Sequence, residues 1–120
     1  MATDDNDTPQ WQSVFRPTLF SNKVALVTGG GSGIGRSIAK ELACLGATVV
    51  IASRDEGKCI AAADEMNKEI ERYMMMKSNS IGNVSYGRVV VGPSTSIRNE
   101  EQVNNLVSAA TLFCVAQNTF

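Results

Sequence analysis

The sequence contains no histidine and few cysteines, which limits the metal and disulfide chemistry that it can support. Its cysteines, Cys44, Cys59 and Cys114, are odd in number and lie far apart along the chain. Without histidine they match neither the spacing of a zinc site nor a framework of paired disulfides. We therefore interpret them as small core residues, expect no metal site, and expect a reducing compartment.

A large charge of either sign is also lacking, because the formal net charge is −1. Nucleic-acid-binding domains are usually strongly basic, so no nucleic acid partner is expected. No apolar run reaches the roughly 18 residues that a membrane span requires. The acidic residues 1–9 lack the basic and apolar regions of a secretory signal. These absences favour a cytoplasmic protein without a membrane span.

The length of 120 residues suffices for one domain but not for a second hydrophobic core. We expect residues 1–22 to form a mobile tail and a flanking segment. The domain itself is expected at residues 23–115, with a short tail at residues 116–120. Within the first segment, the scattered apolar residues at 11–21 indicate chain laid against the domain.

Short apolar runs alternate with segments of helical periodicity. The runs at 23–28, 48–52 and 88–91 predict three buried strands. The apolar positions that predict the helices are Ile34, Ile38, Leu42 and Leu45, then Ile60, Ala63, Met66 and Ile70, then Val103, Leu106, Val107 and Ala110. The order βαβαβα predicts an α/β fold with a parallel sheet, which is half of a doubly wound fold.

Local signals mark where the helices begin and end. Ser53 with Glu56, and Asn99 with Gln102, have the spacing of capping boxes at the starts of the second and third helices. Residues 78–87 are rich in serine, asparagine and glycine, so we expect a loop there before the third strand.

A glycine-rich stretch follows the first predicted strand and opens the first predicted helix. It consists of Thr28-Gly-Gly-Gly-Ser-Gly-Ile-Gly35. Glycine lets the backbone approach a pyrophosphate closely, and a helix N-terminus offers free N–H groups and a partial positive charge. Because the stretch lies between a strand and a helix of a βαβ unit, it predicts a phosphate-binding turn.

This stretch is similar to the TGxxxGIG fingerprint of the short-chain dehydrogenase/reductase superfamily, with Gly29, Gly33 and Gly35 at the glycine positions. The resemblance implies an NADP-binding Rossmann domain, of which this chain holds the N-terminal half. It also implies that Gly29, Ser32, Gly33, Ile34 and Gly35 contact the cofactor.

Three further stretches, Ile51–Arg54, Ala62–Met66 and Ile97–Val107, resemble the peroxisomal trans-2-enoyl-CoA reductase branch of that superfamily. That branch implies an acyl-CoA thioester substrate, NADPH-dependent reduction of its 2,3-double bond, and a place in peroxisomal fatty-acid metabolism. The 2,4-dienoyl-CoA reductases and the 3-oxoacyl reductases share the fingerprint, so both stay open as alternatives. The residues 117–120 do not form a peroxisomal address.

The residues after the second strand predict the choice of nicotinamide cofactor. An acidic residue there would accept hydrogen bonds from a ribose 2′-hydroxyl, but Ser53 and Arg54 occupy the position. Ser53 can hydrogen-bond a 2′-phosphate and Arg54 can neutralise it, which favours NADPH. Two alternatives are that Ser53 only caps a helix and that Asp55 pairs with Arg54. After the third strand, the resemblance implies that Ser96 contacts the adenine.

No catalytic residue is expected in this chain, because the family's serine, tyrosine and lysine lie in the second half of the fold. Tyr73 and Lys77 have the spacing Y-x-x-x-K, but they fall on the second helix, away from the carboxyl ends of the strands. We interpret them as a chance match on a helix surface. Asn104 and Asn105 lie inside the third helix, so they do not match the family's asparagine either.

Absence of the C-terminal half would leave the first strand, at residues 24–27, as an open apolar edge. This gives a second hypothesis from another class of function. The chain would then be a non-catalytic protein that pairs through this edge with itself or with a full-length relative.

Overall fold

Three strands and three helices alternate along the part of the chain that the structure describes. A computed structural model describes residues 14–81 and 86–118, without the side chains of 77–81 and 117–118. The elements are β1 (Val24–Thr28), α1 (Gly33–Cys44), β2 (Thr48–Ala52), α2 (Glu56–Ile81), β3 (Arg88–Val91) and α3 (Glu100–Asn118). The predicted order βαβαβα is confirmed, and the arrangement is a partial Rossmann-like fold.

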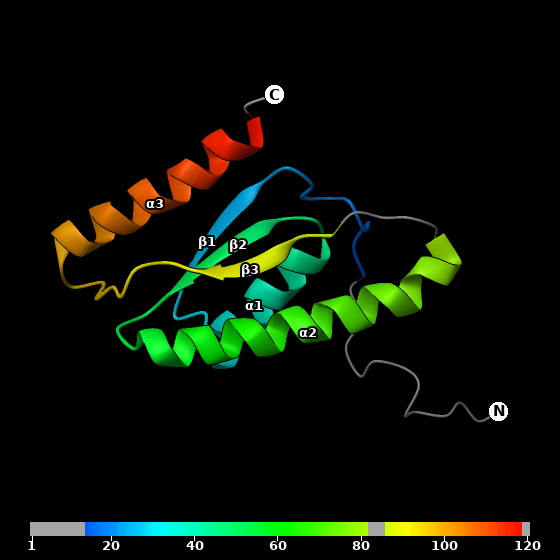
Figure 1. The fold of residues 1–120 in the computed structure, drawn as a ribbon, viewed down its shortest axis with the longest axis horizontal. Helices are drawn as coiled ribbons and strands as arrows, with labels where there is room; N and C mark the ends of the chain where they lie inside the picture. Colours follow the sequence, from blue (N-terminus) through cyan, green and yellow to red (C-terminus); the bar gives the residue numbers. More distant parts are fainter. Residues whose placement is uncertain (1–13, 82–85, 119–120) are drawn as a thin grey trace.

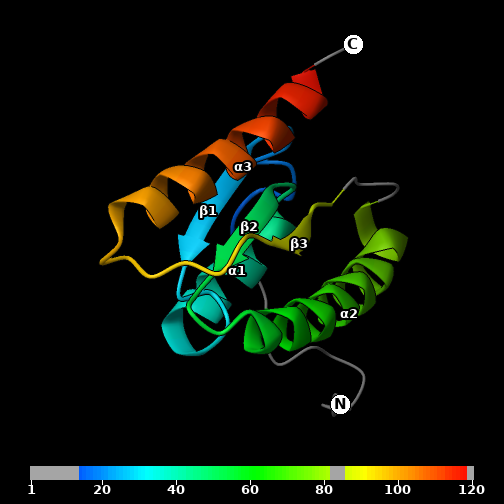
Figure 2. The same cartoon turned by 60° about the vertical axis from the view of Figure 1, so that its left-hand side comes forward.

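The strands form one parallel sheet in the order β1-β2-β3. Val24 is level with Thr48 in the first pair, and Thr48 with Arg88 in the second. The central strand, with the sequence TVVIA, is buried along its whole length. Figure 1 shows α1 and α2 on one face of the sheet and α3 on the other, and Figure 2 shows α3 running beside β1.

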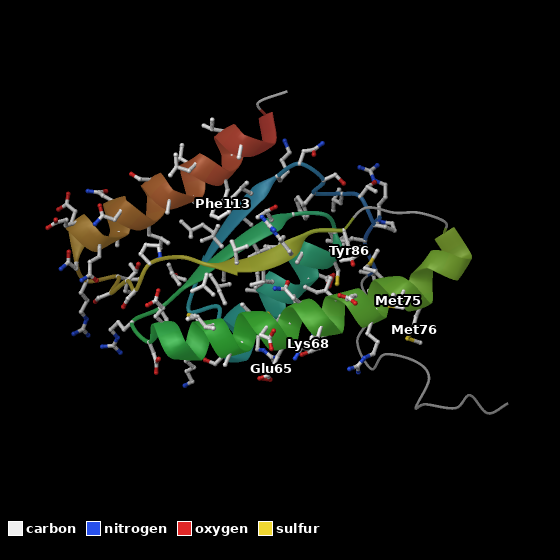
Figure 3. The ribbon with its side chains drawn as sticks, viewed as in Figure 1. Glu65, Lys68, Met75, Met76, Tyr86 and Phe113 are labelled. Atoms are coloured by element: carbon white, nitrogen blue, oxygen red, sulfur yellow. The ribbon has the colours of Figure 1, made fainter. Side chains whose placement is uncertain are left out.

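The sheet has a hydrophobic cluster on each face, because successive side chains of a strand point in opposite directions. Val49 and Ile51 of β2 belong to the larger cluster with α1 and α2. Val50 and Ala52 pack on the other face against Leu106, Ala110 and Phe113 of α3, and Figure 3 shows Phe113 between that helix and the sheet.

Helix α1 packs through its small residues, which corrects part of the predicted pattern. Ala39 and Ala43 have no exposed surface, whereas Ile34 and Ile38 are exposed. The alanines let the helix backbone approach the sheet closely. Of the positions predicted in α2, Ala63, Met66 and Ile70 are buried and Ile60 is exposed, and in α3 Leu106 and Ala110 are buried while Val107 is exposed.

Helix α2 is longer than the sequence predicted and begins with a different cap. It continues to Ile81, so 78–81 belong to a helix rather than a loop, while 82–85 lie outside the described residues. The prediction failed because Tyr73 and Met74 are buried, and their packing extends the helix beyond Ile70. At its start, the backbone N–H of Lys58 donates to Oδ1 of Asp55, so Asp55 is the cap in place of Ser53.

The flanking segment and the last helix are partly described. Phe20 contacts the larger cluster, and its N–H donates to the carbonyl of Leu45, so the segment meets the domain at Phe20, whereas Val14 and Phe15 are exposed. The predicted mobile tail at residues 1–9 lies outside the described residues. Helix α3 continues through Asn118, past residue 115 where the domain was predicted to end.

The two edges of the sheet differ. On the β3 edge, the side-chain amide of Asn67 accepts the N–H of Val89 at 2.8 Å and donates to its carbonyl at 2.9 Å. Asn67 therefore takes the place of a further strand at that point. Within the described residues no strand pairs with the outer edge of β1.

Candidate functional site

The glycine-rich turn joins the carboxyl end of β1 to the start of α1. Gly29 and Gly33 have φ angles of +71° and +58°, a conformation that residues with side chains rarely adopt. A Cβ atom added at either position would meet no protein atom within 4 Å. Gly35 serves a different purpose, because a Cβ there would collide with the carbonyl oxygen of Gly29. The backbone at Gly29 and Gly33 thus faces an open space, while Gly35 packs tightly against the carbonyl of Gly29.

The first residues of α1 complete this turn. Ser32 is the N-cap, with an extended backbone and a side chain that makes no capping hydrogen bond. The first hydrogen bond of the helix runs from the N–H of Arg36 to the carbonyl of Ser32. The N–H groups of the three residues before Arg36 have no acceptor within the helix, so they are available to an anion.

Ser53 and Arg54 follow β2 at the same end of the sheet. The Ser53 hydroxyl accepts the N–H of Asp55 at 3.2 Å and lies 3.2 Å from the sulfur of Cys59. Arg54 is exposed, and its carbonyl accepts the Ser94 hydroxyl at 2.9 Å. Within the described residues, Asp55 forms no ion pair with Arg54. The pairing that would have weakened a positive site is therefore not present.

The segment after β3 is tied to the end of β2 by its backbone. The N–H of Thr95 donates to the carbonyl of Ser53 at 2.8 Å. Ser96 donates its N–H to the side-chain oxygen of Gln102 at 2.8 Å, and its hydroxyl accepts the N–H of Arg98. In α3 the N–H of Gln102 donates to Asn99. Only half of the predicted capping box is present there, because the Gln102 side chain is directed to Ser96.

These segments line one cavity of about 460 Å³, open to solvent, at the carboxyl ends of the strands. Figure 1 shows the chain leaving β2 and β3 toward the same end of the sheet. Of the predicted site residues, the cavity brings together Gly29, Ser53, Arg54 and Ser96. The remaining residues of its lining are Thr28, Ala52, Thr95, Ile97 and Arg98. Among the residues that the structure describes, the only charged ones in this lining are Arg54 and Arg98, so the cavity suits an anion.

The other predicted residues do not line this cavity. Gly33 and Ile34 lie on a second groove along α1, with Ser37, Ile38, Glu41 and Leu42. Ser32 is the N-cap of α1, Gly35 lies in the first turn of that helix, and Ile34 is 81% exposed. The turn and the cavity meet at Gly29. A ligand that occupies both would therefore extend from the helix N-terminus to the end of β3.

Sequence reasoning missed Arg98, Ile97 and Thr95. Thr95 is buried, with its hydroxyl donating to the carbonyl of Pro93 at 2.7 Å, and it shapes the wall without facing solvent. For Arg98, the available signal was its position two residues after Ser96, which was itself predicted to contact the ligand.

Tyr73 is buried in the larger hydrophobic cluster, with 7% of its surface exposed. The interpretation as a match on a helix surface is therefore wrong for the tyrosine, which is a core residue. It lies on α2, in the part that packs against the sheet. The Lys77 side chain lies outside the described part. Asn104 and Asn105 lie inside α3, as predicted, and both are exposed.

The cysteines are free, and two of them are core residues. Cys44 and Cys59 are buried, and Cys114 is partly buried. Burial, together with the nearby Glu41 carboxylate, raises the pKa of the Cys44 thiol to about 12, so it stays protonated at neutral pH. Among the described residues there is no group of three side chains suited to hold a metal ion. No described helix is long and apolar enough to cross a membrane.

The fold and the site define a Rossmann-type α/β domain with a glycine-rich turn after its first strand. The chain belongs to the short-chain dehydrogenase family, whose model matches residues 23–112. It is 34% identical over 103 residues to an uncharacterized oxidoreductase of Staphylococcus aureus, covering 86% of this chain and 34% of that protein.

Among named relatives, the chain is 49% identical over 55 residues to a probable 2,4-dienoyl-CoA reductase of Caenorhabditis elegans, covering 46% of this chain and 18% of the relative. It is 42% identical over 62 residues to the peroxisomal 2,4-dienoyl-CoA reductase of Pongo abelii, covering 52% and 21%. The chain thus spans a fifth to a third of these relatives' lengths.

Solved structures share the fold. A citronellol catabolism dehydrogenase of Pseudomonas aeruginosa PAO1 superposes with a TM-score of 0.62 at 34% identity, over 91% of this chain and 37% of that chain. The C-domain of a bacterial malonyl-CoA reductase, solved with NADP, has a TM-score of 0.63 at 30% identity, over 79% of this chain and 13% of that chain.

Proposed function

We propose that this chain is the NADPH-binding half of a reductase that acts on the double bond of an unsaturated acyl-CoA thioester. The observation that carries the proposal is that an open helix N-terminus and a cavity meet at Gly29, and that the charged lining residues in the described part of the chain are two arginines. A dinucleotide needs both features, because its pyrophosphate and its adenosine bind at different points along the strand ends.

The turn fits the pyrophosphate. Gly29 and Gly33 leave open space where a side chain would stand, and the free N–H groups at the start of α1 can donate to phosphate oxygens. The unengaged Ser32 hydroxyl can add a donor there. We assign Gly35 to the support of the turn, because its missing side chain lets α1 pack against Gly29.

The cavity fits an adenosine that carries a 2′-phosphate. Arg54 is exposed, has no carboxylate partner among the described residues, and offers a planar fork of donors. The Ser53 hydroxyl donates to the carbonyl of Asp55 at 3.2 Å and can rotate its hydrogen from there toward the phosphate, and Ser96 can contact the base. No acidic residue of the described ranges, 14–81 and 86–118, lines the cavity to repel the phosphate. A metagenomic short-chain oxidoreductase solved in complex with NADP, at 26% identity and TM-score 0.56, supports NADP as the cofactor.

The substrate class is proposed from the relatives. When bound, the cofactor supplies a hydride, and an enoyl thioester can accept one at its β-carbon. Relatives named as 2,4-dienoyl-CoA reductases, one of them peroxisomal, favour an unsaturated acyl-CoA and a peroxisomal setting. This chain's own residues bind and orient the cofactor, and we assign no catalytic step to them.

Titration of the chain with NADPH and NADH, followed by calorimetry, tests the proposal. We expect tighter binding of NADPH, and we expect Arg54→Asp to abolish or invert the preference, because a carboxylate would face the 2′-phosphate. Arg88→Asp is the matched control, since Arg88 is exposed at the amino end of β3, away from the cavity. Tighter binding of NADH by the unaltered chain would show that the assignment of Ser53 and Arg54 is wrong.

A further inference from the structure

The cavity at the strand ends contains a second arginine whose position is fixed by the fold. Arg98 lies in the turn between β3 and α3, where its N–H donates to the Ser96 hydroxyl at 3.3 Å. The N–H of the next residue, Asn99, donates to the carbonyl of Ser96 at 3.0 Å. The backbone of Arg98 is thus held on both sides, while its side chain is exposed and lines the cavity.

This arginine shares its cavity with Arg54, although the two lie in segments that follow different strands, β3 and β2. Hydrogen bonds from Ser94 to the carbonyl of Arg54, and from Thr95 to the carbonyl of Ser53, hold the two segments together. Within the described residues neither guanidinium forms an ion pair. Two cations that line one cavity without a carboxylate partner favour an anion there, because each attracts it and the anion screens their mutual repulsion.

We propose that Arg98 is a second specificity-determining residue, which binds the same 2′-phosphate as Arg54. A phosphate monoester carries about two negative charges near neutral pH, so one arginine neutralises only half of it. Two guanidiniums match that charge and can satisfy its three terminal oxygens. The inference rests on the proposed NADPH site. It adds a residue that follows β3 to the phosphate contacts already proposed for the residues that follow β2.

An alternative role for Arg98 makes a different prediction. A guanidinium that stacked on the adenine ring would contribute equally to NADPH and NADH, because both carry the same base. A guanidinium on the 2′-phosphate contributes to NADPH alone. The ratio of the two dissociation constants therefore separates the two roles.

The test is calorimetric titration of NADPH and NADH into the unaltered chain and into Arg98→Gln, Arg98→Lys and Arg88→Gln. We expect Arg98→Gln to weaken NADPH binding about tenfold, as for one lost charge-assisted contact, with NADH unchanged. Arg98→Lys should retain part of the affinity, and Arg88→Gln all of it. Binding of NADPH should also depend less on salt in Arg98→Gln.

Several outcomes would overturn the inference. Equal weakening of both cofactors in Arg98→Gln would assign Arg98 to the base, and unchanged affinities would remove it from the site. Either result leaves the proposed function intact. Failure of the unaltered chain to bind NADPH would overturn the proposed function as well. Because Arg98 is exposed, we expect all variants to unfold at the same temperature as the unaltered chain.

Discussion

Gly33 shows how a single residue in the turn combines a backbone requirement with a role in binding. Its φ of +58° is unfavourable for any residue with a side chain, and the space beside it is empty of protein atoms. A conformation of this kind is retained where the backbone must be approached closely. The pyrophosphate proposed for this turn would be such a neighbour.

We expect Gly33→Val to abolish NADPH binding and to lower the free energy of unfolding by about 1–2 kcal/mol, because a branched side chain is strained at this φ. Calorimetry at a temperature where the variant is fully folded measures the first effect, and urea unfolding the second. Gly57→Ala is a control outside the turn, since its Cβ would make only ordinary contact, 3.6 Å from Oδ1 of Asp55. Unchanged NADPH affinity in Gly33→Val would contradict the phosphate-binding role of the turn.

At the level of the elements, α2 stabilises the sheet at its β3 edge. The two hydrogen bonds between Asn67 and Val89 satisfy backbone groups of a residue that is 2% exposed. Removing the side chain would leave an N–H and a carbonyl without these partners. Such groups cost more when unsatisfied than a typical hydrogen bond contributes.

Asn67→Ala is therefore expected to lower the free energy of unfolding by about 1–3 kcal/mol, measured by urea denaturation. The free energy of unfolding of Asn67→Asp should lie between those of Asn67→Ala and the unaltered chain. Its carboxylate still accepts the N–H of Val89 but cannot donate to the carbonyl. A value for Asn67→Ala equal to that of the unaltered chain would show that water replaces the amide at this edge.

Helices α1 and α2 are joined by a small ionic cluster on the same side of the sheet. The carboxylate of Glu69 accepts a hydrogen bond from Nζ of Lys40 at 2.8 Å and another from a guanidinium nitrogen of Arg36 at 2.9 Å. Partial burial alone would raise the pKa of Glu69. The hydrogen bonds and charges of Lys40 and Arg36 outweigh it, and the pKa lies below its ordinary value of 4.5.

Because the folded pKa of Glu69 is lower than the unfolded one, its stabilisation is complete above pH 4.5 and is lost as the pH falls through the folded value. We expect Glu69→Gln to be less stable at pH 7, by about 1 kcal/mol or less because the pair is partly exposed. The difference should shrink in acid, as measured by urea unfolding at pH 7 and pH 3. A difference that grew toward pH 3 would contradict this account.

For the molecule as a whole, signals carried within a few residues predicted the fold and part of the site. Gly29 and Arg54 were predicted because a glycine turn and the residues after a strand have local patterns. Arg98 enters the cavity only because β3 pairs with β2, which local sequence does not show. Asn67 was missed for the same reason, since its partner Val89 is 22 residues away.

The greater length of α2 shows a case in which the local composition predicted the wrong structure. Ser78, Asn79 and Ser80 have the composition of a loop, and that composition predicted one. Burial of Met66, Ile70, Tyr73 and Met74 along one side of the helix supplies the packing that local propensity lacks. Figure 3 shows Met75 and Met76 on the part of α2 that extends past the strands, where both are exposed.

The open edge of β1 leads to a prediction about association. Leu26 is 37% exposed on this strand, and Ile38 of α1 is also exposed. The backbones of Lys23 and Gly29 form hydrogen bonds with β2. Successive residues of a strand direct their backbone groups to alternate edges. Leu26 is three residues from each, so its backbone groups point to the open edge. We expect the chain to pair with a second copy through β1, and Leu26→Pro to prevent it by removing an edge donor.

Light scattering over a range of concentrations measures this association. The unaltered chain should approach the mass of a dimer, and Leu26→Pro should stay a monomer. A mixture with a full-length relative would show whether the same edge pairs with that protein instead. A monomer at every concentration for the unaltered chain would contradict pairing with a second copy.

The most direct test of the central claim, that the strand ends of this chain bind NADPH, is an amide NMR titration of the isotope-labelled chain with that cofactor. The account predicts that the largest shifts occur at Gly29, Gly33, Ser53 and Arg54, and that NADH moves the signals of Ser53 and Arg54 much less. No saturable change at these four residues, or changes confined to the far part of α2, would contradict it.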